Sequence, residues 1–407
     1  MTEKNGVVVV SAARTPFGKF GGVLKDIPSI ELGAVVIREV LRRTGISGEE
    51  VDETYYGTAM PAEVALETDV PARQATLKAG MPADSISLTI DRACCSSMAA
   101  VRLGFRAIKA GEIEVALAVG AENMGRTPYF TTDIRWNKGL GHIQLLDGLH
   151  ELGYPGFHPV SVDAGEVALE YGIIREDQDQ WAYQSQRKYQ KALSEGKFKV
   201  GEELMRVEIP QRKGDPIILE KDEFPRPDTT LEKLSRLPLI YGSPTVTAGN
   251  APGLDTGASA LLIMSRKKAE ERGLRPLAKI ISMVPAAMTP RLLAATPGFT
   301  IQKLLEKAHV NLDRIDLIEI NEAFAAVPLV SIKILADGNS KKMEDLLRKT
   351  NVNGGAIAIG HPVGASGARI LMTLIYELRR RGGGIGVASI CGGLAQGEGA
   401  IVQVERK

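Results

Sequence analysis

The chain has 407 residues, with 50 Lys or Arg against 49 Asp or Glu, so its formal net charge is only +1. This balance gives no electrostatic reason to expect nucleic acid or a membrane surface as a partner, and a small molecule is the simpler expectation. No stretch reaches the roughly 18 apolar residues of a membrane-spanning helix, and the start has no cleavage-site pattern. With three cysteines, too few for a disulfide framework, we expect free thiols in a soluble, cytoplasmic protein.

The predicted elements begin with a strand and alternate with helices. The run GVVVVSAARTP at 6–16 is β-branched and closed by turn residues, which is typical of a buried strand. An amphipathic helix is expected over 31–45. A second helix carries apolar residues at helical spacing over 98–108 and is followed by Gly111 and the strand VALAVG at 115–120.

The second half of the chain repeats this plan. A strand starts at Leu277, an amphipathic helix covers 301–311, an apolar helix face runs from Ile370 to Leu378, and the strand GVASI covers 386–390. Two halves built from alternating strands and helices indicate the α/β class, with parallel or mixed sheets covered by helices. Functional residues are then expected in loops beyond the strand ends.

The middle of the chain, over residues 123–245, differs from both halves in its residue composition. It carries both tryptophans, Trp136 and Trp181, and several polar stretches, which favour an insertion over a third repeat. We therefore predict three units. The first is an N-terminal half made of residues 1–122 with 246–274, the second is an inserted loop domain over 123–245, and the third is a C-terminal half over 275–407.

A cysteine stands at the predicted start of the second helix. Cys94 comes just before SSMAAV, where free backbone N–H groups and the helix dipole favour an anion, so its pKa is expected to be lowered. The alternative is that Cys94 and its neighbour Cys95 are simply small buried hydrophobic side chains.

His361 and Cys391 occupy strand-end positions in the second half that correspond to Cys94 in the first. A pseudo-twofold packing of the halves would bring the three together, and Cys with His is the minimal activated-nucleophile pair. A structural turn is the alternative use of His361. Zinc is not expected, because C-x-x-C and H-x-x-x-H spacings are absent, and the glycine-rich stretches do not match a dinucleotide fingerprint.

Several ordered motifs resemble the thiolases, the acyl-CoA C-acyltransferases. They are VVVVSAARTPFGKFGG near the start, CCSS at 94–97, GAENM at 120–124, TVTAGNA at 245–251, NEAF at 321–324, GGAIAIGHPVGASGAR at 354–369 and CGG at 391–393. The resemblance implies a five-layered αβαβα fold of two similar halves with an inserted loop domain that binds coenzyme A. It also implies a homodimer or homotetramer, with no covalently bound cofactor and with coenzyme A as co-substrate.

The resemblance assigns roles residue by residue. Cys94 matches the nucleophile that is acylated, and Cys95 is a small neighbour. His361 matches the histidine that activates the nucleophile and helps hold the thioester oxygen, and Asn321 matches the residue that positions a water there. Cys391 matches the acid/base at the substrate α-carbon, and the backbone N–H groups of Cys94 and Gly393 would form a second oxyanion hole.

Contacts to coenzyme A are implied at four positions. Arg226 matches an adenosine-side contact, and Ala248 lies in the matching TVTAGNA motif. Lys233 stands where a serine contact is usual, and Pro252 replaces a serine that contacts the pantetheine arm. The resemblance is therefore weakest in this part of the site.

The acyl pocket also departs from the family pattern. Val160 and Ser161 replace a Met-Gly pair that usually lines it, and the loop that would roof it contains Tyr129, Phe130 and Trp136. These changes raise the hypothesis that the enzyme accepts a larger 3-ketoacyl group than acetoacetyl, with simple loop drift as the alternative.

Two other functions compete with a catalytic thiolase. A β-ketoacyl synthase shares the implied fold but lacks a C-x-G cysteine, so Cys391 argues against it. A non-catalytic CoA-binding subunit of a larger assembly would explain the altered contacts but predicts loss of the catalytic residues, all of which are present. A hetero-subunit alongside catalysis stays an alternative to a homo-oligomer.

Overall fold

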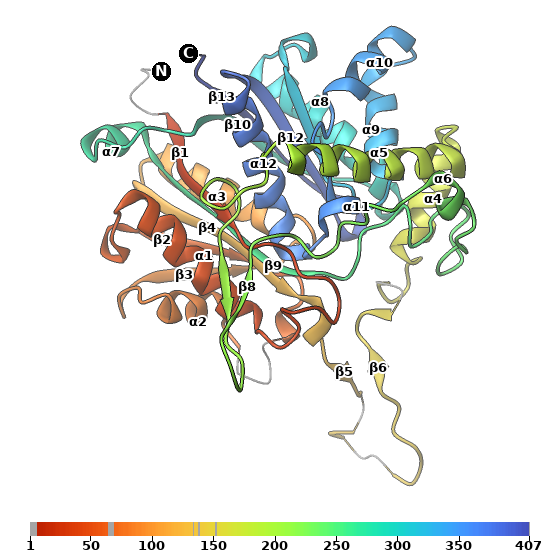
Figure 1. The fold of residues 1–407 in the computed structure, drawn as a ribbon, viewed down its shortest axis with the longest axis horizontal. Helices are drawn as coiled ribbons and strands as arrows, with labels where there is room; N and C mark the ends of the chain where they lie inside the picture. Colours follow the sequence, from red (N-terminus) through yellow and green to blue (C-terminus); the bar gives the residue numbers. More distant parts are fainter. Residues whose placement is uncertain (1–5, 64–68, 133, 137–138, 151–152, 407) are drawn as a thin grey trace.

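The computed structural model describes residues 6–63, 69–132, 134–136, 139–150 and 153–406 (Figure 1). The N-terminal half contains β1 (Val7–Arg14), α1 (Ser29–Thr44), β2 (Glu53–Gly57), α2 (Pro71–Lys78), β3 (Ile86–Ile90), α3 (Ser96–Ala110), β4 (Val115–Asn123), β9 (Thr256–Ser265) and α7 (Arg266–Glu271). The C-terminal half contains β10 (Ala278–Ala287), α8 (Thr296–Ala308), β11 (Leu317–Ile320), α9 (Ala326–Ala336), α10 (Ser340–Lys349), α11 (Ala356–Ile359), α12 (Ser366–Arg380), β12 (Gly384–Gly392) and β13 (Gln396–Val404).

The segment between β4 and β9 has its own small elements. They are β5 (Tyr129–Phe130), β6 (Leu146–Asp147), α4 (Val160–Glu170), α5 (Arg175–Ser194), β7 (Val207–Ile209), β8 (Ile217–Leu219) and α6 (Leu231–Ser235). Short 3-10 helices cover Gly48–Glu50, Met124–Arg126, Pro290–Ala294, Leu312–Arg314, Val363–Ala365 and Gly393–Ala395. No helix in the described part of the chain is long and apolar enough to cross a membrane.

The main sheet has the strand order β11-β12-β13-β10-β1-β9-β4-β2-β3. In one half, β4 pairs parallel with β2 and antiparallel with β9; in the other, β12 pairs parallel with β11 and antiparallel with β13. Strand β1 pairs antiparallel with β9, and β10 pairs antiparallel with β13. A short antiparallel pairing of β1 with β10 joins the two halves of the sheet. Outward from β1 the order is β9, β4 and β2, and outward from β10 it is the corresponding β13, β12 and β11, with β3 added at the N-terminal edge. The predicted repeat is confirmed.

Five layers result from this arrangement. Helices α3 and α12 contact each other and share one core with residues from both half-sheets, so they form the central layer. Helices α1 and α2 cover the outer face of the N-terminal half-sheet, and α8 and α9 cover the outer face of the other (Figure 1). The predicted αβαβα fold is confirmed.

Strand β1 shows why its sequence is an unbroken apolar run. Val7 and Val9 pack into the central layer, whereas Val8 and Val10 pack on the side of α1. Successive side chains of a strand point to opposite faces, and here helices cover both. All of β1 is therefore buried.

The insertion is tied to the C-terminal half by one buried carboxylate. Glu322 accepts hydrogen bonds from Trp181 Nε1 at 2.9 Å and Ser185 Oγ at 2.8 Å, both on α5. It also accepts from Asn351 Nδ2 at 3.0 Å and from the Ile357 N–H at 3.1 Å. Four donors from three segments converge on this side chain, next to Asn321 in the sequence.

Replacing Glu322 with Ala should destabilise the protein strongly. Each donor left without a partner in the interior costs about 1 to 3 kcal/mol, so we expect a loss of at least about 3 kcal/mol in the free energy of unfolding. Glu322→Gln keeps the shape and one acceptor oxygen and should lose less. Denaturant unfolding of both variants measures this; equal stability of Glu322→Ala and wild type would show that the four contacts are not formed.

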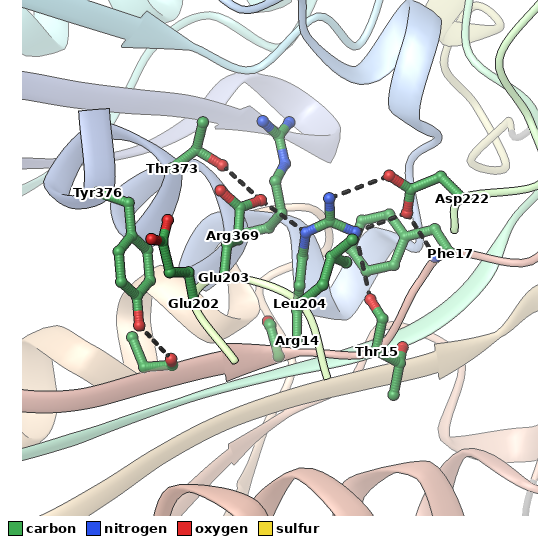
Figure 2. Close-up of polar contacts among 12 residues, drawn as sticks. Arg14, Thr15, Phe17, Glu202, Glu203, Leu204, Asp222, Arg369, Thr373 and Tyr376 are labelled. Carbon is green, nitrogen blue, oxygen red and sulfur yellow. Dashed lines mark hydrogen bonds and ion pairs between the residues drawn. The ribbon is translucent and has the colours of Figure 1, made fainter. Parts of the chain in front are cut away.

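A second anchor joins the insertion to β1. The Arg14 guanidinium is fully buried and pairs with Glu203 Oε1 at 2.7 Å and Asp222 Oδ1 at 2.6 Å, both between β4 and β9 (Figure 2). Tyr189 Oη on α5 also donates to Asp222, at 3.1 Å. The interior thus holds a paired ionic cluster whose members come from both the insertion and the N-terminal half.

Candidate active site

Cys94 lies in a tight turn between β3 and α3. Ala93 has φ of 50°, a left-handed conformation that is strained for a residue with a Cβ. The Ser96 hydroxyl donates to the Ala93 carbonyl at 2.6 Å and accepts from the Arg92 N–H at 2.8 Å, which holds the turn. A strained strand-to-helix turn of this kind presents a nucleophile at the end of a sheet.

The sulfur of Cys94 sits in an apolar setting. Cys94 is partly exposed and packs against the cluster of Met124, Leu149 and Val363, which come from three different segments. Burial, with a smaller contribution from the carboxylates of Glu122 and Asp91, raises the pKa of Cys94 to about 12. The expectation of a lowered pKa is therefore wrong for the free enzyme, because desolvation outweighs the helix start.

His361 is buried and held in one tautomer. Its Nδ1 lies 2.6 Å from Ser366 Oγ, and the Ser366 hydroxyl donates to the Pro362 carbonyl at 2.8 Å. Since that hydroxyl hydrogen is already used, Ser366 Oγ accepts from Nδ1–H, and Nε2 carries the lone pair. Burial, with the charge of Arg369, lowers the pKa of His361 to about 3, so the ring is neutral.

The lone pair of His361 faces Asn321. Asn321 Nδ2 lies 3.4 Å from His361 Nε2, and both residues are buried. Val363, two residues after the histidine, belongs to the apolar cluster at Cys94. The structure thus brings the predicted histidine, asparagine and nucleophile to one end of the sheet.

Cys391 reaches the same place from β12. It is buried, and burial raises its pKa, with a further contribution from Cys94. The Cys95 thiol donates to the Ile390 carbonyl at 3.5 Å, so the turn of Cys94 lies against the end of β12. A Cβ placed on Gly392 would lie only 3.0 Å from Cys95 Sγ, which explains a glycine at this close approach.

Gly393 borders a residue that the sequence did not single out. A Cβ on Gly393 would lie 1.7 Å from Tyr154 Oη, so the tyrosine ring rests directly on this glycine. Burial raises the pKa of Tyr154 to about 12, and Cys94 adds to this shift. Tyr154 therefore stands as a neutral phenol beside Cys94 and Gly393.

Two buried carboxylates hold the surrounding loops. Glu122 accepts from the Gly364 N–H at 2.9 Å and from the Ala59 and Met60 N–H groups at 2.8 and 3.1 Å, which links loops of both halves. Asp255 Oδ2 accepts from the His361 N–H at 2.7 Å. The signal for Glu122 was present in the sequence, because a charged residue at the end of the buried run VALAVGAEN must have partners.

The four residues expected to contact coenzyme A lie at the surface of the insertion and its return to β9. Arg226 is exposed, stands 4.7 Å over the Phe224 ring and reaches toward the Ala248 carbonyl at 3.5 Å. Lys233 pairs with Asp228 at 2.6 Å. Pro252 is half-buried just beyond. Arg226 and Ala248 are neighbours, whereas Lys233 already has a carboxylate partner.

The residues expected to shape the acyl pocket lie elsewhere. Tyr129 is 64% exposed and Trp136 77% exposed, on the arm of β5 and β6 that extends away from the sheet (Figure 1). Phe130 is also exposed, and Val160 packs on the core beneath α4. Ser161 is buried, and its carbonyl accepts from Ser243 Oγ. The aromatic roof predicted over the pocket is therefore wrong within this chain.

Among the described residues, His158, Asp163 and Glu166 form the one group of potential metal ligands, with ligand atoms within 4.8 Å of one another. His158 Nδ1 lies 3.5 Å from Asp163 Oδ1, and His158 is mostly exposed. A hydrogen bond between His158 and Asp163 accounts for their short separation. The group contains neither His361 nor any of the three cysteines.

The reactivity of Cys94 should follow the pKa values of the resting site. A thiol with pKa near 12 beside a histidine with pKa near 3 stays neutral, so thiolate forms only as the pH rises. Alkylation by iodoacetamide should therefore accelerate by about tenfold per pH unit between about pH 6 and pH 9. Stopped alkylation with peptide mass spectrometry measures this rate; a plateau below about pH 8 would indicate a thiolate–imidazolium pair instead.

Comparison with known proteins decides the family. The model of the thiolase N-terminal domain matches residues 7–267 and that of the thiolase C-terminal domain matches residues 274–404. The chain belongs to the thiolase family. An acetyl-CoA acetyltransferase of Cupriavidus necator is 45% identical to this thiolase over 98% of the chain and 99% of its own length, and one of Syntrophomonas wolfei is 40% identical over 98% of each chain.

Solved structures agree with the thiolase assignment. The acetyl-CoA acetyltransferase of Bacillus anthracis superposes with a TM-score of 0.90 at 37% identity, covering 98% of each chain. Human mitochondrial 3-ketoacyl-CoA thiolase in complex with CoA superposes with a TM-score of 0.87 at 36% identity, again over 98% of each chain. This thiolase is accordingly a CoA-dependent acyltransferase that cleaves or forms 3-ketoacyl-CoA, and nothing favours the non-catalytic alternative.

Proposed function

We propose that this thiolase works through an acyl-Cys94 intermediate, with His361, Asn321 and Cys391 in the roles that the family resemblance implies. The observation that carries the proposal is the convergence of both halves on one point. Cys94 packs with Val363 of the second half, and the end of β12 lies against the Cys94 turn. A nucleophile, a neutral base and a second thiol thus share one buried site.

The first half-reaction breaks the carbon–carbon bond. Cys94 Sγ attacks the C3 carbonyl of a 3-ketoacyl-CoA while His361 Nε2 takes the thiol proton. Because both groups rest neutral, this transfer accompanies the attack. The C2–C3 bond then breaks, its electron pair stays on C2 as an enolate, and the Cys391 thiol protonates C2. Acetyl-CoA leaves, the acyl group remains on Cys94, and Cys391 is a thiolate.

The second half-reaction transfers the acyl group. The thiol of a second coenzyme A gives its proton to the Cys391 thiolate and attacks the acyl-Cys94 carbonyl. The tetrahedral oxyanion would accept hydrogen bonds from the Cys94 and Gly393 N–H groups. Collapse releases the shortened acyl-CoA, and the Cys94 sulfur takes back its proton from His361. The acyl-Cys94 thioester is exchanged for an acyl-CoA thioester of similar free energy, so this half-reaction is reversible.

The substrate proposal rests on the space beside Cys94. Leu149 is buried against Cys94, and Tyr154 covers Gly393, so both side chains would limit the length of the acyl chain. We therefore expect acetoacetyl-CoA to be the preferred substrate, in place of the larger group suggested by the altered pocket residues. Arg226 and Ala248, exposed on the insertion side, would meet the coenzyme A moiety.

Assembly into a homo-oligomer forms part of the proposal. Among the described residues, strand β3 pairs with β2 alone, and its side chains Ile86 and Leu88 are exposed at 60% and 51%. An edge strand with exposed aliphatic side chains is a ready surface for a second copy of the chain. Trp136 on the β5–β6 arm offers further apolar surface. Sedimentation equilibrium would test this; a monomer at micromolar concentration would contradict it.

Tyr154 should limit the length of the acyl group. Tyr154→Ala should shift the ratio of kcat/KM for medium-chain 3-ketoacyl-CoA over acetoacetyl-CoA upward by about 10- to 200-fold, because a ring-sized space opens beside Cys94. Tyr154→Phe keeps the ring and should keep the wild-type preference. Thiolysis assays across acetoacetyl-CoA and straight, branched and aromatic 3-ketoacyl-CoAs provide the measurement. A wild-type preference for any longer substrate by about tenfold would overturn the short-chain proposal.

A further inference from the structure

Helix α12 presents two polar side chains to the active site from one face. Ser366 accepts from His361 Nδ1, and three residues later Arg369 Nη2 donates to Asn321 Oδ1 at 3.3 Å. Residues three apart on a helix lie on the same side. Helix α12 therefore contacts the His361 ring at Nδ1 and the Asn321 side chain that faces Nε2.

The arginine decides which way the Asn321 amide points. A guanidinium has only donors, so the amide must turn its oxygen toward Arg369. Its NH₂ group then faces His361 Nε2, 3.4 Å away. A flipped amide would set donor against donor at Arg369 and acceptor against lone pair at His361. Arg369 thus fixes a donor at the place where the thioester oxygen would bind.

Arg369 forms no direct ion pair with a described carboxylate, although the charges of Glu319 and Glu203 favour its protonated form. It is fully buried, yet its Nε and Nη1 have no hydrogen-bond partner among the described residues. Glu203 lies beside it (Figure 2), and its Oε1 accepts from Arg14 Nε and from Thr373 Oγ1 at 3.0 Å, whereas its Oε2 makes no hydrogen bond with a described residue. A buried cation with incomplete hydrogen bonding destabilises a protein, which favours a functional reason for keeping it.

We infer that Arg369 is a positioning residue of this thiolase, which holds the Asn321 amide so that its NH₂ group faces His361 and the thioester oxygen. The inference rests on the proposed roles of Asn321 and His361. It adds a third member to that arrangement, one that touches neither substrate nor nucleophile and acts through the amide alone.

A double-mutant cycle tests this inference. Arg369→Met fills similar volume without donors, so the amide can rotate. We expect kcat for thiolysis to fall by about 10- to 100-fold while KM for the acyl-CoA changes by less than about threefold. In the Asn321→Ala background, the same change should alter kcat by less than about twofold, because nothing is left to orient.

Thr373→Val is the matched control, since Thr373 lies one turn further along α12 and donates to Glu203 without touching Asn321. It should leave kcat within about twofold. Arg369→Lys keeps a donor for the Asn321 oxygen and should keep kcat within about threefold of wild type. A folded Arg369→Lys that loses about tenfold or more would overturn the inference whether or not Arg369→Met folds, as would additive losses in the Arg369→Met cycle or an equal loss in Thr373→Val. An inactive wild type would instead overturn the proposed function.

Discussion

Replacing Cys94 with Ala is expected to lower the rate of thiolysis by at least about 10⁴-fold. The nucleophile forms the covalent intermediate, and removing such a group leaves only the contribution of binding and oxyanion stabilisation. The adjacent thiol cannot substitute, because Cys95 is fully buried and its thiol is directed to the Ile390 carbonyl. Steady-state thiolysis of acetoacetyl-CoA by purified variant and wild type measures the loss.

Cys95→Ala is the control for that experiment. It removes an adjacent thiol from the same turn but changes only packing, so turnover should stay within about tenfold of wild type. If Cys95→Ala lost as much activity as Cys94→Ala, the assignment of the nucleophile to Cys94 would have to be abandoned.

Cys391→Ala should separate the two chemical tasks of the site. Loss of a general acid/base costs about 10²- to 10⁴-fold, so both thiolysis and condensation should fall by that factor. Transfer of an acyl group from acyl-CoA to Cys94 needs Cys391 only to protonate the departing coenzyme A, and a thiolate leaves more readily than an enolate. Acylation of Cys94 should therefore persist and be slowed less than thiolysis and condensation. Burst kinetics of acylation alongside steady-state turnover would show this split. A variant that keeps full turnover would exclude Cys391 as the proton carrier.

The fold was largely predictable because its signals are local. Strand β1 is buried on both faces and reads as an unbroken run of valines, and α3 ends at Gly111, whose φ of 79° suits a glycine. The repeat in the second half then predicts the second half-sheet, which the pairing of β12 with β11 and β13 confirms.

The environment of the site was not predictable in the same way. The raised pKa of Cys94 depends on Met124, Leu149 and Val363, which reach it from three separate segments. The residues next to Cys94 in the sequence indicate the field of the helix start, but they do not indicate the desolvation caused by these distant segments. Tyr154 was missed for a related reason, because no periodic pattern predicts where an irregular loop returns to the sheet.

The position of Tyr129 and Trp136 was predicted incorrectly from the sequence. Aromatic residues in a loop next to a motif were expected to line the pocket, but the loop leads outward and leaves them exposed. The aromatic residue types indicate an apolar surface, but they do not indicate where the loop places that surface.

Acylation of Cys94 can be observed directly by mass spectrometry of the protein after mixing with acetyl-CoA in the absence of another acceptor. We expect one acetyl group per chain, located on the peptide that contains Cys94, and removed when free coenzyme A is added. An acetyl group found only on Cys95 or Cys391, or none on any cysteine of an enzyme that still turns over, would contradict this expectation.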